Sequence, residues 1–248
     1  MHHLHWLENA TTRRRARTAL IWSVVITLAL YVIPFGAFIA YPLLLISTLF
    51  HELGHGIAAI LGGGTFVRFQ MFADGSGVAQ HQGEYGAGVR AMIAAGGLVG
   101  PAVVAALAFV AGRGVRGSRI LLGVLAVGLA VAIALVVRNP FGIVFTTGLV
   151  LAFGWLALRS SAETVQLASV LLATQLALSV FSRADYLFTE SAVTGAGTMP
   201  SDTAQMAISL GGSYWMWGLA CGAFSLLVLA GGVMWFARVL REPDRRLR

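Results

Sequence analysis

The chain has 248 residues, of which 58% are hydrophobic and only 11% are charged. This composition excludes a soluble globular domain and is typical of a polytopic membrane protein. The single cysteine, Cys221, excludes an internal disulfide and a cysteine cluster for metal binding. The net charge of +7 comes from arginine alone, because the sequence contains no lysine. Since most of these arginines flank apolar segments, we expect a lipid bilayer and not a nucleic acid as their partner.

Seven apolar segments follow one another along the chain. The first, residues 18–33, comes after a basic and polar N-terminal tip of residues 1–17, whose first part we expect to be an unstructured end. The other segments are residues 40–61, 89–111, 120–137, 142–158, 164–181 and 214–236. We therefore predict an all-α polytopic membrane protein with about 6–7 transmembrane helices. Its single transmembrane domain covers residues 18–237, and a basic C-terminal tail covers residues 238–248.

The second apolar segment carries the sequence His51-Glu52-Leu53-Gly54-His55. On a helix, His51 and His55 are four residues apart and share a face, so both can bind one metal ion. Apolar residues flank the motif on both sides, and ionisable groups at membrane depth are costly and usually functional. The motif predicts a zinc site in which the two histidines are ligands and Glu52 is the general base.

The periodicity of the chain changes after this motif. Three glycines at residues 62–64 allow a tight reversal, and from residue 65 the side chains alternate as they do in a strand. Asp74-Gly75 is a turn signal, so we predict a small β-hairpin over residues 65–82, inserted after the HExxH helix. The edge of such a hairpin can pair with an extended substrate backbone, although a plain connection between two spans is the alternative.

The third apolar segment presents a face of small residues. Gly96 and Gly100 stand at a GxxxG spacing, which lets another helix approach closely. We expect the helix that carries the HExxH motif to be this neighbour.

A catalytic zinc ion usually has three protein ligands and keeps its fourth position for water. The candidates for the third ligand beyond the motif are His81, Asp74, Glu84, Glu163, Asp185, Glu190 and Asp202. Asp185 is the preferred candidate, because it ends an apolar run and can be held at membrane depth near the motif helix. Asp202 is the alternative third ligand, although Ser201-Asp202 after Pro200 is also typical of a helix N-terminus.

Several of these residues together resemble the site-2 protease family of intramembrane zinc metalloproteases, and most closely its short bacterial branch (peptidase M50B-like). The HExxH motif inside a membrane span is the most specific element of this resemblance. The other matching elements are the Asp74-Gly75-Ser76-Gly77 turn, the Gly100-Pro101 pair, the Asn-Pro stretch of Arg138-Asn139-Pro140-Phe141-Gly142, and Ser201-Asp202.

The resemblance implies that His51 and His55 bind zinc and that Glu52 activates water. It also implies that an aspartate late in the chain completes the site and that the site opens towards the cytoplasm. The Asn-Pro stretch of this chain lacks the aspartate that the better-known members carry soon after it. Asn139 is a candidate substrate-binding residue. The alternative interpretation is that Asn139 is a turn residue before Pro140.

The predicted function is hydrolysis of a peptide bond in or near a transmembrane segment of a membrane-protein substrate. The enzyme would be a zinc endopeptidase (Zn2+ as its metal) in the bacterial cell membrane. Two alternatives remain open. One is a membrane-bound zinc protease of another class, with Glu163 or Glu190 as its third ligand. The other is a non-catalytic metal-binding membrane scaffold.

The arginine distribution leaves the membrane orientation undecided at this stage. If all seven apolar segments cross the membrane, eight arginines fall on the N-terminal side and nine on the other side. Because the positive-inside rule needs a clear excess on one side, these counts favour neither orientation.

Overall fold

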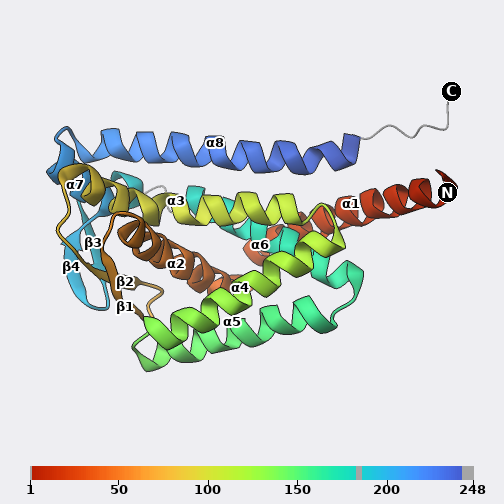
Figure 1. Ribbon diagram of the computed structural model, residues 1–248, viewed down its shortest axis with the longest axis horizontal. Helices are drawn as coiled ribbons and strands as arrows, with labels where there is room; N and C mark the ends of the chain where they lie inside the picture. The colour runs from red at the N-terminus through yellow and green to blue at the C-terminus, as the bar shows by residue number, and fades with distance from the viewer. Residues whose placement is uncertain (1, 183–185, 242–248) are drawn as a thin grey trace.

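The computed structural model describes residues 2–182 and 186–241, and most of its helices run roughly along the long axis of the molecule (Figure 1). The helices are α1 (His2–Val32), α2 (Gly36–Leu61), α3 (Ala87–Ala111), α4 (Val115–Leu135), α5 (Pro140–Arg159), α6 (Ala162–Ser182), the 3-10 helix η1 (Tyr186–Phe188), α7 (Asp202–Leu210) and α8 (Tyr214–Arg241). Two short hairpins and α7 lie together at one end of the long axis, whereas the start of α1 and the end of α8 lie at the other (Figure 1).

Six of the described helices are long and apolar enough to cross a membrane. They are α2, α3, α4, α5, α6 and α8, which confirms the predicted all-α polytopic fold. α1, which carries the first predicted apolar segment from residue 18, is not among these six helices.

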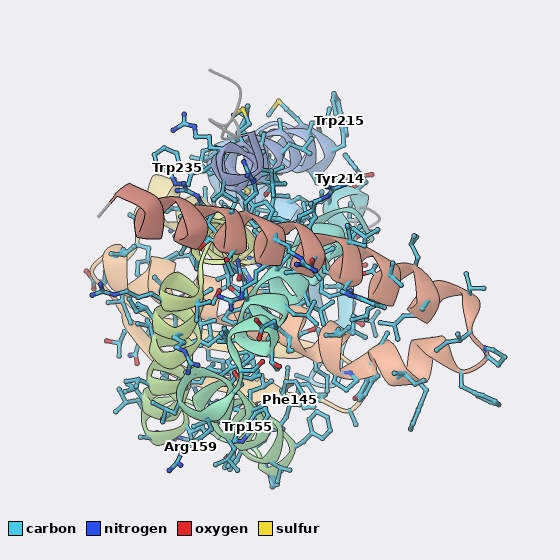
Figure 2. All side chains as sticks on the ribbon, turned by 90° about the vertical axis from the view of Figure 1, so that its right-hand side faces the viewer. Phe145, Trp155, Arg159, Tyr214, Trp215 and Trp235 are labelled. Atoms are coloured by element: carbon cyan, nitrogen blue, oxygen red, sulfur yellow. The ribbon has the colours of Figure 1, made fainter. Side chains whose placement is uncertain are left out.

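α1 also corrects the expectation of an unstructured N-terminal end. The helix begins at His2 and contains no glycine or proline that would interrupt it. Its basic part lies at the start of α6, where Arg15 Nε donates to Glu163 Oε1 at 2.8 Å. Farther along, the Ser23 and Thr174 hydroxyl oxygens lie 3.2 Å apart, so the two helices run in the same general direction. α1 crosses the end of the bundle that faces the viewer in Figure 2.

The hairpin predicted after the motif helix is confirmed. β1 (Thr65–Met71) and β2 (Gly77–Gln82) pair antiparallel. The outer edge of β1 is already occupied, because the Phe69 amide donates to the Val136 carbonyl at 2.7 Å and the Arg138 amide donates to the Phe69 carbonyl at 3.0 Å. Among the described residues, β2 pairs only with β1, so the other edge of β2 has no strand beside it.

A second hairpin, which was not predicted from the sequence, precedes α7. β3 (Ser191–Thr194) and β4 (Gly197–Pro200) pair antiparallel and lead directly into α7. The Gly195 amide at its turn donates to Ser76 Oγ in the turn of the first hairpin at 2.9 Å. The two hairpin turns therefore contact each other, and the second hairpin places the start of α7 inside the helix bundle.

The predicted close approach of α3 to the motif helix is confirmed by the glycines between them. A Cβ atom on Gly54 of α2 would lie 2.2 Å from the carbonyl oxygen of Gly96 on α3. A Cβ atom on Gly100 would lie 2.8 Å from the carbonyl oxygen of Phe50. Only glycine permits backbones to pack this closely, and the contact sets the position of the HExxH turn against α3.

Candidate metal centre

Three side chains bring potential ligand atoms together at the hairpin end of the bundle: His51, His55 and Asp202. His51 Nε2 lies 3.1 Å from His55 Nε2 and 3.1 Å from Asp202 Oδ2, and His55 Nε2 lies 3.4 Å from Asp202 Oδ1. A tetrahedral metal ion with bonds of about 2.0–2.1 Å holds its ligand atoms roughly 3.3 Å apart. The spacing of these three groups therefore fits one zinc-sized ion.

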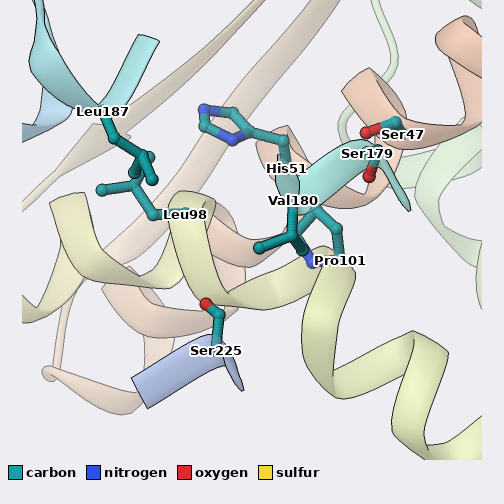
Figure 3. Close-up of a pocket in the computed structure, with 8 residues that line it drawn as sticks. All are labelled: Ser47, His51, Leu98, Pro101, Ser179, Val180, Leu187 and Ser225. Carbon is teal, nitrogen blue, oxygen red and sulfur yellow. The ribbon is translucent and has the colours of Figure 1, made fainter. Parts of the chain in front are cut away.

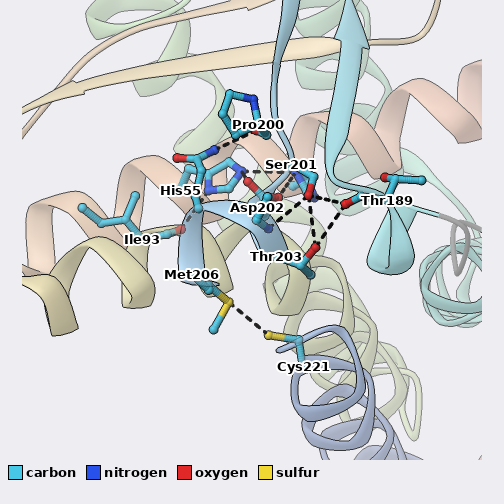
Figure 4. A network of polar contacts seen from close by, with 12 residues as sticks. His55, Ile93, Thr189, Pro200, Ser201, Asp202, Thr203, Met206 and Cys221 are labelled. Atoms are coloured by element: carbon cyan, nitrogen blue, oxygen red, sulfur yellow. Dashed lines mark hydrogen bonds and ion pairs between the residues drawn. The ribbon is translucent and has the colours of Figure 1, made fainter. Parts of the chain in front are cut away.

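The local sequence of α2 and α3 fixes the orientation of the His55 ring. Its Nδ1 atom donates to the carbonyl oxygen of Ile93 at 2.8 Å, which leaves Nε2 as the atom that can bind metal (Figure 4). Gly97 lies directly beneath the ring, and a Cβ atom there would be 2.2 Å from Nε2. The His55 ring is thus held by the hydrogen bond to Ile93 and by its packing against the backbone at Gly97.

Asp202 is placed by the cap of α7. Ser201 is the N-cap residue: its Oγ accepts from the Ala204 amide at 3.1 Å and donates to the Thr189 carbonyl at 2.6 Å (Figure 4). The cap predicted from Ser201-Asp202 is therefore present, and it does not prevent the next side chain from pointing towards the histidines.

The Asp202 carboxylate is buried, with 3% of its surface exposed, and its Oδ2 atom accepts no hydrogen bond. Burial by itself would raise the pKa of this carboxyl group, but His55 and His51 beside it hold that pKa below its ordinary value. An ionised, buried carboxylate oxygen without a donor is the kind of group that a cation satisfies. The donor set of two imidazoles and one carboxylate suits zinc.

Glu52 is buried on α2 beside the first hairpin, with 6% of its surface exposed. A Cβ atom on Gly77 of β2 would lie 2.7 Å from Glu52 Cγ, so the strand passes directly over this side chain. The backbone amide of Ala79, two residues along β2, also faces the Glu52 carboxylate. The residue predicted as general base therefore lies between the motif helix and the strand.

A small cavity of about 40 Å³ borders His51 inside the bundle (Figure 3). It is lined by Ser47, His51, Leu98, Pro101, Ser179, Val180, Leu187 and Ser225. A cavity of this size that has serine hydroxyl groups in its lining is large enough for a water molecule. Ser47, Ser179 and Ser225 supply these hydroxyl groups near His51.

The other candidate residues from the sequence have different surroundings. Asp185 lies outside the described residues. Asn139 donates to the Met71 carbonyl at 2.5 Å and accepts from the Met71 amide at 3.1 Å, so its side chain holds the end of β1. Glu163 pairs with Arg15 at the far end of the bundle, and Glu190 is exposed. Among the described residues, only Asp202 joins the two histidines in a metal-sized group.

The fold and this cluster define a polytopic helical membrane protein with a candidate three-ligand metal centre inside its bundle. The family model described as Peptidase M50B-like matches residues 20–232. Because that match covers most of the chain, the protein belongs to this peptidase family, as the resemblance implied. No curated protein and no solved structure matches the chain.

Proposed function

We propose that this protein is a zinc endopeptidase that hydrolyses a peptide bond in or near a transmembrane segment of another membrane protein. The observation that carries the proposal is the grouping of His51, His55 and Asp202 beside the buried Glu52, on a helix long and apolar enough to span a bilayer. We place it in a bacterial cell membrane, as the resemblance to the short bacterial branch implies.

Each residue of the cluster has a distinct role in this proposal. His51, His55 and Asp202 would hold the metal. Zinc in such a site polarises the scissile carbonyl and lowers the pKa of a bound water to about 7. Glu52 accepts the proton of the attacking water and passes it to the leaving amine. The hydrogen bond from His55 Nδ1 to Ile93 keeps the ring in the ligating tautomer.

The first hairpin supplies a place for the substrate backbone. A helical substrate hides its amides in its own hydrogen bonds, so it must unwind before a peptide bond can reach the metal. The edge of β2 that carries no strand is available to pair with such an extended segment, whereas the corresponding edge of β1 is taken by residues 136–138. Because β2 passes over Glu52 at Gly77, a segment paired with β2 lies close to the general base.

The decisive test compares Glu52→Gln with the unmodified protein. In reconstituted vesicles with a panel of single-span substrates, the variant should keep one zinc ion per chain and lose cleavage. Glu163→Gln is the matched control, because Glu163 pairs with Arg15 at the opposite end of the bundle. If the unmodified protein binds zinc but shows no cleavage that is lost in Glu52→Gln, the result would instead support a non-catalytic metal-binding scaffold.

A further inference from the structure

Two pockets at the end of the bundle opposite to the hairpins share the side chain of Arg15 (Figure 1). The larger pocket, of about 810 Å³, lies between α1 and the start of α4, and Arg116 and Arg119 of α4 also line it. The smaller pocket, of about 520 Å³, lies between α1 and α6 and is lined by Arg14 as well. Because Thr11 also lines both pockets, they are parts of one continuous surface.

The charges around these two pockets favour an anion. Four arginines line them, and Glu163 is the one acidic residue among the described residues that do so, which leaves a net charge of +3. Glu163 accepts a hydrogen bond at 2.8 Å from Nε of Arg15, so this contact leaves both terminal nitrogens of the guanidinium for another acceptor. Arg14 and Arg116 are exposed and can turn towards a ligand. Such a group of guanidinium forks suits a phosphate.

The two pockets lie where three of the candidate membrane spans begin or end. α4 begins at Val115, α5 ends at Arg159 and α6 begins at Ala162. Arg119 joins the first two of these ends, because it donates to the carbonyl oxygens at residues 157 and 160 at 2.6 and 2.7 Å. Since the ends of spans lie among lipid headgroups, the arginines of these pockets are at the level of lipid phosphates.

The smaller pocket continues from its arginines onto an apolar surface between α1 and α6. Ala19 and Trp22 of α1 and Leu167 of α6 line this part, and 52% of the Trp22 surface is exposed. Tryptophan near the end of a span prefers the boundary between headgroups and hydrocarbon. A molecule with a phosphate at one end and hydrocarbon at the other matches this lining, whereas a free phosphate ion would use only the arginines.

We propose that the two pockets together bind one anionic phospholipid. Its phosphate lies between Arg15 and Arg116, Arg14 adds a further positive charge, and an acyl chain lies along Trp22 and Leu167. A lipid in this position contacts α1, α4 and α6 at once, so its binding stabilises the packing of α1 on the bundle. The site is at the opposite end from the metal centre and is independent of the proposed peptidase function.

Titration of the purified protein with lipids in neutral-detergent micelles tests this site. Phosphatidylglycerol should raise the midpoint of thermal unfolding more than phosphatidylcholine does at the same mole fraction. Arg116→Gln should weaken the binding of phosphatidylglycerol, measured by native mass spectrometry, about fivefold, since one arginine near a membrane surface contributes about that factor. Arg14→Gln, in the smaller pocket, should have a similar effect.

Arg159→Gln is the matched control. Arg159, labelled in Figure 2, is exposed at the same end of the bundle but lines neither of the two pockets. Its substitution removes the same charge and should leave the affinity for phosphatidylglycerol unchanged. Equal weakening in Arg116→Gln and Arg159→Gln would overturn the site, because it would show a general attraction of the basic surface for anionic lipid. Equal affinity for the two lipids would overturn it as well.

Glycerol phosphate distinguishes a lipid from a soluble phosphate compound, because it has the phosphate of the headgroup but no acyl chain. At equal concentration it should not displace phosphatidylglycerol from the protein. Displacement would overturn the lipid as occupant and would assign the pockets to a soluble phosphate compound. All of these results leave the proposed peptidase activity untouched, since the Glu52→Gln comparison tests that activity separately.

Discussion

Nε2 of His51 lies 3.1 Å from Oδ2 of Asp202, although one residue is on α2 and the other is on α7. His55 belongs to the same cluster, and the carboxylate approaches each histidine through a different oxygen. This relationship adds a third potential ligand to the two-histidine motif and makes it a candidate three-ligand metal centre.

We expect Asp202→Ala to lose its zinc and Asp185→Ala to keep it. Removal of one of three protein ligands leaves two imidazoles, which cannot complete a tetrahedral site with a single open position. Metal content per chain, measured by mass spectrometry on purified protein, distinguishes the two variants. If Asp185→Ala lost its zinc and Asp202→Ala retained it fully, Asp185, the candidate preferred from the sequence, would be the third ligand.

We expect Gly97→Ala to weaken zinc binding by about 10–100-fold, the range for disturbed supports of metal-binding histidines. The new Cβ atom would lie 2.2 Å from His55 Nε2, so the ring must leave its position over α3. Gly148→Ala on α5 is the matched control, because a Cβ atom there meets nothing within 4 Å. Competition with a zinc chelator measures both affinities, and equal values would contradict the role given to Gly97.

We expect Gly77→Ala to retain zinc but to lose activity by up to about 10²–10⁴-fold, the range that general base catalysis contributes. Its Cβ atom would lie 2.7 Å from Glu52 Cγ and 2.9 Å from Thr48 Cγ2, which displaces the carboxylate from its place under β2. Gly88→Ala, where a Cβ atom meets nothing within 4 Å, should remain active. Initial rates on a single-span substrate provide the measurement, and a fully active Gly77→Ala would show that β2 is not packed on Glu52.

We expect Asn139→Ala to loosen the end of β1. Both of its hydrogen bonds to the Met71 backbone are lost, and each such bond contributes about 0.5–1.5 kcal/mol. Hydrogen exchange at the Met71 amide should become faster and the midpoint of thermal unfolding should fall. Asn139→Asp keeps the acceptor oxygen, so its exchange rate and its unfolding midpoint should lie between those of the unmodified protein and those of Asn139→Ala. Unchanged exchange together with a raised KM would instead favour the substrate-binding role predicted from the sequence.

Local spacing in the sequence was sufficient for the parts of the site that lie close together along the chain. His51 and His55 share a face because four residues make about one helical turn. The first hairpin followed from alternation and the Asp74-Gly75 turn, and the contact of α2 with α3 followed from a GxxxG spacing. The second hairpin was not predicted because each of its strands has only four residues. The β-branched residues Val193, Thr194 and Thr198, which lie around two glycines, are a weak signal for it.

The membrane class, the HExxH helix and the hairpin that follows it thus all follow from local patterns in the amino-acid sequence. The meeting of Asp202 with the histidines follows only from the folded chain, and so does the position of α1 beside α6 with its arginines far from the hairpins. The physical reason is the range of the interactions involved. Helical and strand periodicity act over a few residues, whereas the approach of α7 to α2 depends on the packing of every helix and hairpin that lies between them in the chain.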